Sequence, residues 1–221
     1  MAVISLNREF LFLLAPGTGS TVVANALVDS GIGRWFPAQD MYLGRDGQGF
    51  LPRKHTHYEH FREWGLLEGT LSDTCVVTTV RNPFDFWVSE YLRHRTRWSK
   101  GLGDSDSHIY RNEKGAEAVA RSTELEFGDW LKCRWEPFGD EHTQLLHPQF
   151  TRRANRVLRF EALSETFEAW LREEGIADPV QLRRENTTQR ESDYRDYYDA
   201  ESRELVERIF SPYLERYDYS F

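Results

Sequence analysis

The sequence predicts an α/β fold, with one domain over residues 1–221 whose central parallel sheet is flanked by helices, as in P-loop proteins. Two segments, 10–30 and 75–92, each read as a buried strand, a short turn and a helix, and a third begins at residue 156. The chain has 221 residues, which is the size of one ordinary domain. No repeat or low-complexity linker divides it.

In the first segment, Phe10–Ala15 is a continuous apolar run that ends at Pro16 and Gly17, as expected of a buried strand. Apolar residues at helical spacing then predict a helix from Thr21 to about Ser30, which Gly31 ends. A strand, a turn of small residues and a helix in this order are typical of a nucleotide-binding α/β unit.

The second segment is similar. Cys75–Val80 is rich in β-branched residues and predicts a buried strand, and Pro83 suits the first turn of the helix that follows. Residues 99–112 read as a mobile loop, and a further helix is expected over about 123–135.

The third segment predicts a strand over 156–160 and then a helix that Ser164 caps and Gly175 ends. A last helix is expected from about 199 to 210, with Asp199 as its N-cap.

Composition narrows the function classes. Apolar residues make up 39% of the chain and aromatic residues 14%, which argues against disorder. No stretch is long and apolar enough to span a membrane. The net charge of −8 disfavours a nucleic-acid partner. No signal peptide is recognisable at the N-terminus, so we expect a cytoplasmic protein.

The turn Pro16–Thr21 has the composition of an anion-binding loop. Small residues between a strand and a helix let backbone N–H groups converge on an anion, and Ser20 and Thr21 add hydroxyl donors. The Gly-x4-Gly-Lys-Ser/Thr pattern of ATP- and GTP-binding loops is absent. A plain strand-to-helix turn is the alternative interpretation.

A second candidate element follows the strand 75–80. Arg81 stands at the carboxyl end of this strand, the edge at which α/β sheets bind ligands. Ser89 comes eight residues later, about two helical turns. A guanidinium and a hydroxyl together suit a phosphate. The alternative interpretation is that Arg81 forms a surface ion pair and that Ser89 has no special role in its helix.

Together these elements resemble the sulfotransferases that use 3′-phosphoadenosine-5′-phosphosulfate (PAPS), in particular the carbohydrate (Golgi-type) branch and its bacterial relatives. The family's Arg-Phe-Glu-x-Leu segment is similar to residues 159–163, and its C-terminal tail to residues 197–221. The resemblance implies that Pro16, Gly17, Thr18, Gly19, Ser20 and Thr21 hold the 5′-phosphosulfate. It implies that Arg81 and Ser89 bind the 3′-phosphate, and that Asn186, Thr187 and Arg190 belong to a loop that closes over the cofactor.

One position departs from the family pattern. The family's loop carries a Lys that contacts the oxygen bridging phosphate and sulfate, and Gly17 stands there in this chain. A cation at that oxygen stabilises the charge that grows as the sulfuryl group leaves. Arg53 and Lys54 are the predicted replacements.

The segment that follows the first helix holds the predicted catalytic base. Attack on sulfur requires the acceptor hydroxyl to lose its proton, and a histidine of near-neutral pKa suits this role. His55 is the best match to the family, and His57 is the second candidate. Their spacing with His60 completes no metal-ligand pattern, so we predict no metal.

Acceptor-binding residues are predicted on two segments, Glu59 beside the histidines and His147 with Gln149 before the third strand. The resemblance implies transfer of a sulfuryl group from PAPS to a hydroxyl or amine of a carbohydrate or small molecule, with 3′,5′-bisphosphoadenosine (PAP) as product. Two alternatives stay open: a non-catalytic nucleotide-binding relative, and a P-loop kinase-like phosphotransferase.

Overall fold

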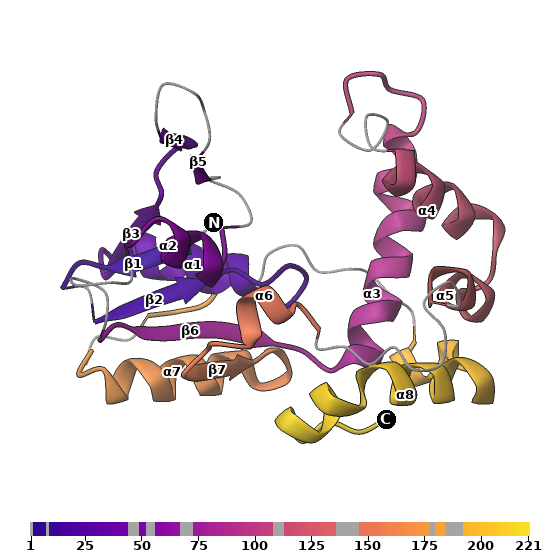
Figure 1. Cartoon of the computed structure of the whole chain (residues 1–221). Coiled ribbons are helices and arrows are strands. Elements are labelled where there is room, and N and C mark those ends of the chain that lie inside the picture. The colour runs from indigo at the N-terminus through magenta and orange to yellow at the C-terminus, as the bar shows by residue number, and fades with distance from the viewer. Residues whose placement is uncertain are drawn as a thin grey trace. The chain divides into compact units, whose positions relative to one another are not determined.

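We analysed a computed structural model of the chain (Figure 1). It describes residues 2–7, 9–43, 49–51, 56–66, 73–107, 113–135, 146–176, 180–183 and 192–221. The chain forms two compact units, one of Met1–Arg81 with His147–Glu185 and the other of Asn82–Leu146 with Asn186–Phe221. That the whole chain is one domain stays a prediction.

The first unit is built on a five-stranded sheet in the order β3-β1-β2-β6-β7. Its strands are β1 (Ala2–Ser5), β2 (Phe10–Leu13), β3 (Gly33–Phe36), β6 (Cys75–Val80) and β7 (Arg156–Arg159). The predicted strands β2, β6 and β7 are parallel neighbours, which confirms a parallel centre.

The sheet as a whole is mixed rather than parallel, which corrects the prediction. Both β1 and β3, which the sequence analysis did not foresee, pair antiparallel. The short connection between β1 and β2 accounts for the first of these pairings, because a few residues suffice to join antiparallel strands but not parallel ones.

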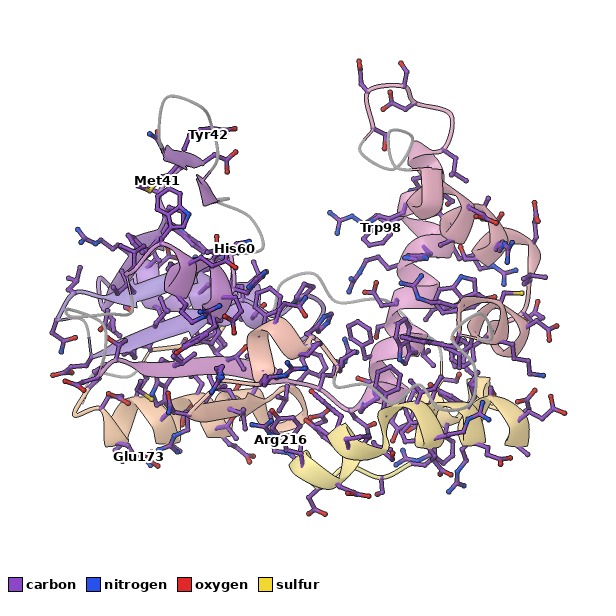
Figure 2. All side chains as sticks on the ribbon, viewed as in Figure 1. Met41, Tyr42, His60, Trp98, Glu173 and Arg216 are labelled. Atoms are coloured by element: carbon purple, nitrogen blue, oxygen red, sulfur yellow. The ribbon has the colours of Figure 1, made fainter. Side chains whose placement is uncertain are left out.

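Helices cover both faces of this sheet. On one face, α1 (Ser20–Asp29) and α7 (Leu163–Glu173) bury a core that includes Phe12, Val77 and Trp170. On the other face, α2 (Tyr58–Glu63) and α6 (Pro148–Thr151) contribute Phe61 and Phe150 to a second core. The hairpin of β4 (Met41–Leu43) and β5 (Gly49–Leu51) completes the unit, and Figure 2 labels its exposed residues Met41 and Tyr42.

Two helix ends fall where glycines predict them. Gly31 and Gly175 have φ angles of 72° and 74°. Around each, the amides of the glycine and of the next residue donate to carbonyls of the last helical turn, which is the Schellman pattern. The predicted cap of α7 is wrong: Ser164 lies inside the helix, because a 3-10 turn η3 (Phe160–Ala162) leads directly into Leu163.

The second unit is helical. It comprises α3 (Pro83–Thr96), η1 (Trp98–Gly101), α4 (Glu113–Glu124), α5 (Phe127–Trp135), η4 (Tyr194–Tyr197) and α8 (Ala200–Tyr217). Its core is strongly aromatic, and the ring of Trp87 contacts the rings of Trp130, Trp135 and Phe210.

Three boundaries in this unit differ from the sequence analysis. The predicted loop 99–112 begins within the turn η1. The predicted helix 123–135 is divided between α4 and α5. The last helix continues past residue 210 through Pro212. Because proline has no N–H, it cannot donate to the carbonyl of Arg208 as a helical residue would. The Ser211 hydroxyl donates to this carbonyl at 3.3 Å.

No helix within the described ranges combines the length and the apolar character that crossing a membrane requires.

Candidate functional site

The loop between β2 and α1 takes a conformation that requires its glycines. Gly17 and Gly19 have φ angles of 71° and 78°, in the left-handed region that side chains disfavour. A Cβ on Gly19 would also lie 2.9 Å from Leu163 Cδ2 and 3.0 Å from Phe160 Cδ2. The sequence predicted a loop of small residues here, and the structure shows why two of them are glycine.

Hydroxyl groups hold this loop against the sheet. The hydroxyls of Thr18 and Ser20 both donate to the carbonyl of Ala15, at 2.8 and 2.7 Å. The Thr18 hydroxyl also pairs with that of Thr79 on β6. Since Thr18 has given its only proton to Ala15, Thr79 is the donor in this pair.

The backbone amides supply the loop's anion-binding capacity. Among the described residues, none accepts a hydrogen bond from the N–H groups of residues 17–21. The first turn of α1 contains no acidic side chain, so the positive end of the helix dipole is not offset there. Consecutive unpaired amides at a helix N-terminus suit a phosphate or sulfate group. Thr21, which is exposed, fits its predicted role as a further donor.

Arg81 is brought onto this loop. Its Nη1 donates to the carbonyl of Gly17 at 2.8 Å, and its guanidinium carbon lies 4.0 Å from the centre of the Phe160 ring. The residue is only 7% exposed. The structure therefore joins two elements that the sequence predicted separately, because β2 and β6 are parallel neighbours whose carboxyl ends meet at one edge.

The position that holds Lys in the sulfotransferases carries a backbone that disfavours a side chain. A lysine at residue 17 would adopt the same left-handed φ, at a cost of about 1–2 kcal/mol. The Arg81 guanidinium lies beside this residue, because its Nη1 donates to the Gly17 carbonyl.

Ser89, the predicted partner of Arg81, lies on α3 in the helical unit and is 3% exposed. Its joint action with Arg81 stays a prediction. Asn82 caps the same helix by accepting a hydrogen bond from the Phe84 amide at 3.0 Å, with Pro83 in the first turn as predicted.

His57 stands at the N-cap position of α2 and stacks on His60, with 3.8 Å between ring centres. The His57 amide donates to His60 Nδ1 (3.3 Å), so this nitrogen of His60, labelled in Figure 2, carries no proton. Burial, and secondly the neighbouring His60, lower the pKa of His57. His57 is therefore neutral at pH 7, the state in which a base can accept a proton.

The predicted acceptor residues lie on α2 and around α6. His57 and His147 both present their rings to Phe150, at 6.0 and 6.3 Å. Phe150 belongs to the same buried cluster as Ala15, the residue before the anion-binding loop. Gln149 is exposed. Glu59 pairs with Arg62, and this hydrogen bond lowers the pKa of Glu59.

Six predicted site residues lie outside the described residues: Arg53, Lys54, His55, Asn186, Thr187 and Arg190. In the part of the chain that is described, no group of three or more metal-ligating side chains comes together.

Sequence reasoning missed Thr79 and assigned no role to Phe160. Each had a signal: Thr79 carries a hydroxyl near the end of a buried apolar strand, and Phe160 is the last residue of a predicted strand that was expected to lie in the same sheet as the one before Arg81.

Comparisons with protein families, with curated proteins and with solved structures found no match to this chain. The resemblance to the sulfotransferases accordingly rests on the sequence motifs described above.

Proposed function

We propose that this chain is a PAPS-dependent sulfotransferase with a P-loop-like nucleotide site. The observation that carries the proposal is the row of amides at residues 17–21 from which no described residue accepts a hydrogen bond, beside which Arg81 adds a buried positive charge. Such a site fits the anionic groups of a nucleotide, and the family resemblance assigns the loop amides to the 5′-phosphosulfate and Arg81 to the 3′-phosphate of PAPS.

PAPS supplies an activated sulfuryl group, so the protein has mainly to bind, orient and polarise. The loop amides and the Thr21 hydroxyl hold the 5′-phosphosulfate, whereas the Ser20 hydroxyl, predicted as a further donor, donates to the Ala15 carbonyl. Arg81 and Ser89 hold the 3′-phosphate, and Asn186, Thr187 and Arg190 close over the nucleotide. His55 takes the proton of the acceptor, a carbohydrate or small molecule, with His57 as the alternative base, and Glu59, His147 and Gln149 position that acceptor.

A cation is needed near the departing bridging oxygen. Arg53 and Lys54 remain the proposed source, because they are adjacent in sequence to His55. Arg53 is preferred because, if this stretch is extended, residues 53 and 55 share a face.

The test is a transfer assay with radiolabelled PAPS against a panel of sugars, lipids, small alcohols, phenols and peptides. Label in any acceptor, lost when Arg81 is replaced by Ala, supports the proposal. Tight PAP binding without transfer to any acceptor would point to a non-catalytic relative. Gly17, in place of the family's lysine, is the feature of this chain that would account for such an outcome. Magnesium-dependent binding of ATP in preference to PAP would contradict the proposal and favour a phosphotransferase.

A further inference from the structure

The ring of Phe160 stands at the same sheet edge as Arg81 and the anion-binding loop. β6 and β7 are parallel, with Val80 opposite Arg159. The residue that follows each strand is therefore Arg81 after β6 and Phe160 after β7. The pairing of the two strands places this guanidinium and this ring side by side.

One aromatic ring contacts both parts of the site. The Arg81 guanidinium carbon lies 4.0 Å from its centre. On the loop side, Phe160 Cδ2 and Cε2 approach so closely that a Cβ on Gly19 would be 3.0 and 3.3 Å from them. Phe160 is half-buried and lies within the same compact unit as the residues that it contacts.

This arrangement restricts the Arg81 side chain. With its carbon over the ring, the guanidinium is covered by Phe160 on the side that faces the ring. One of its N–H donors reaches the Gly17 carbonyl at 2.8 Å. The ring thus holds the cation against the loop. Together with Leu163, the same ring also blocks movement of the Gly19 backbone in its direction.

We propose that Phe160 is a positioning residue, which holds the Arg81 guanidinium and the loop 16–19 in the anion-binding arrangement before any ligand arrives. A site organised in advance loses less freedom on binding and so binds more tightly. The choice of PAP as the probe rests on the proposed function, whereas the contact between Phe160 and Arg81 does not.

The test compares Phe160→Leu, which removes the aromatic face, with Phe160→Tyr, which retains it. Phe36→Leu is the matched control, since Phe36 is a half-buried phenylalanine on β3 of the same unit whose ring stacks on Phe61. Two quantities are measured: the NMR shift of the Arg81 guanidinium protons without ligand, assigned with Arg81→Lys, and the affinity for PAP by calorimetry.

In the unmodified protein, the guanidinium protons should be shifted upfield by the ring beneath them, and this shift should vanish in Phe160→Leu alone. Phe160→Leu should bind PAP about tenfold more weakly, equivalent to about 1.4 kcal/mol. Phe160→Tyr and Phe36→Leu should bind it as the unmodified protein does.

Two results would overturn the inference while leaving the proposed function intact: no upfield shift in the unmodified protein, which requires no variant to fold, or full PAP affinity in a folded Phe160→Leu. If the shift is present but the unmodified protein binds no PAP, the proposed function fails, and the assigned role of Phe160 in anion binding fails with it.

Discussion

At the scale of single residues, Arg81 combines two contacts that would each be ordinary alone. Its hydrogen bond to the Gly17 carbonyl and its position over the Phe160 ring hold a buried cation beside amides that donate to none of the described residues. A guanidinium in this place adds positive charge beside the loop, which favours an anionic ligand there. The place of Arg81 after a predicted strand was enough to make it a candidate ligand-binding residue. Its contact with the loop, in contrast, depends on which strands pair.

Replacing Arg81 by Ala should lower the affinity for PAP by about 1.5–3 kcal/mol, the range for hydrogen bonds to charged groups. AMP lacks the 3′-phosphate, so its affinity should change little. Calorimetric titration of both nucleotides checks this, with Arg95→Ala, an arginine of the helical unit, as control. Equal losses for the two nucleotides would mean that Arg81 does not distinguish the 3′-phosphate.

The two candidate bases are separable by mutation. His55→Ala should reduce turnover about 10²–10⁴-fold, with PAP affinity unchanged, because a general base acts on the proton and not on the nucleotide. His57→Ala should have a small effect on turnover. Steady-state transfer rates decide between them, and a severe loss in His57→Ala with a mild one in His55→Ala would exchange the two roles.

At the scale of elements, local sequence signals predicted where helices and strands begin and end better than they predicted which strands pair. The strand Cys75–Val80, the proline in the first turn of α3, the cap Asp199 and the glycine stops are all present. Each depends on neighbours within a few residues. The strands β1 and β3 were missed because four residues carry little periodicity and no helix follows either strand directly, whereas the equally short β2 and β7 each lead into a turn and a helix.

The N-terminus of α8 offers an element-scale prediction. Asp199 Oδ1 accepts hydrogen bonds from the amide and hydroxyl of Ser202, at 2.7 and 2.6 Å, and the Ser202 hydroxyl accepts one from the Asp199 amide. Asp199→Ala should therefore lower the free energy of unfolding by about 1 kcal/mol. Urea denaturation measures it, with the exposed Asp73→Ala as control; equal stability of the two variants would show that the cap contributes nothing.

At the scale of the whole molecule, the sequence indicated the parallel centre of the sheet but not the division into an α/β unit and a helical unit. Contacts between segments distant in sequence create that division, and no local pattern encodes them. The candidate site divides in the same way. The loop 16–21 and Arg81 were selected as candidates from strand-end chemistry, whereas the contacts that Thr79 and Phe160 make with them depend on the register of three strands.

Stability should depend on pH through His94. Burial, followed by the charges of Arg134 and Arg93, lowers its pKa from 6.5 to about 4. Between these values the unfolded chain binds more protons than the folded one, so the free energy of unfolding falls as pH decreases through this window. The full shift corresponds to about 3 kcal/mol.

His94→Phe keeps a ring against Trp98 and Trp130 but cannot titrate. Its stability should fall less steeply between pH 6.5 and about pH 4 than that of the unmodified protein, as urea denaturation at several pH values will measure. Parallel curves for the two proteins would show that His94 does not carry the dependence.

The most direct test of the nucleotide site is a pair of titrations of the unmodified protein, one with PAP and one with AMP. The two ligands differ only in the 3′-phosphate, so the comparison isolates the group assigned to Arg81 and Ser89. We predict clearly tighter binding of PAP, with the difference shrinking as salt concentration rises. Equal affinities for the two nucleotides, or no binding of either, would contradict the account.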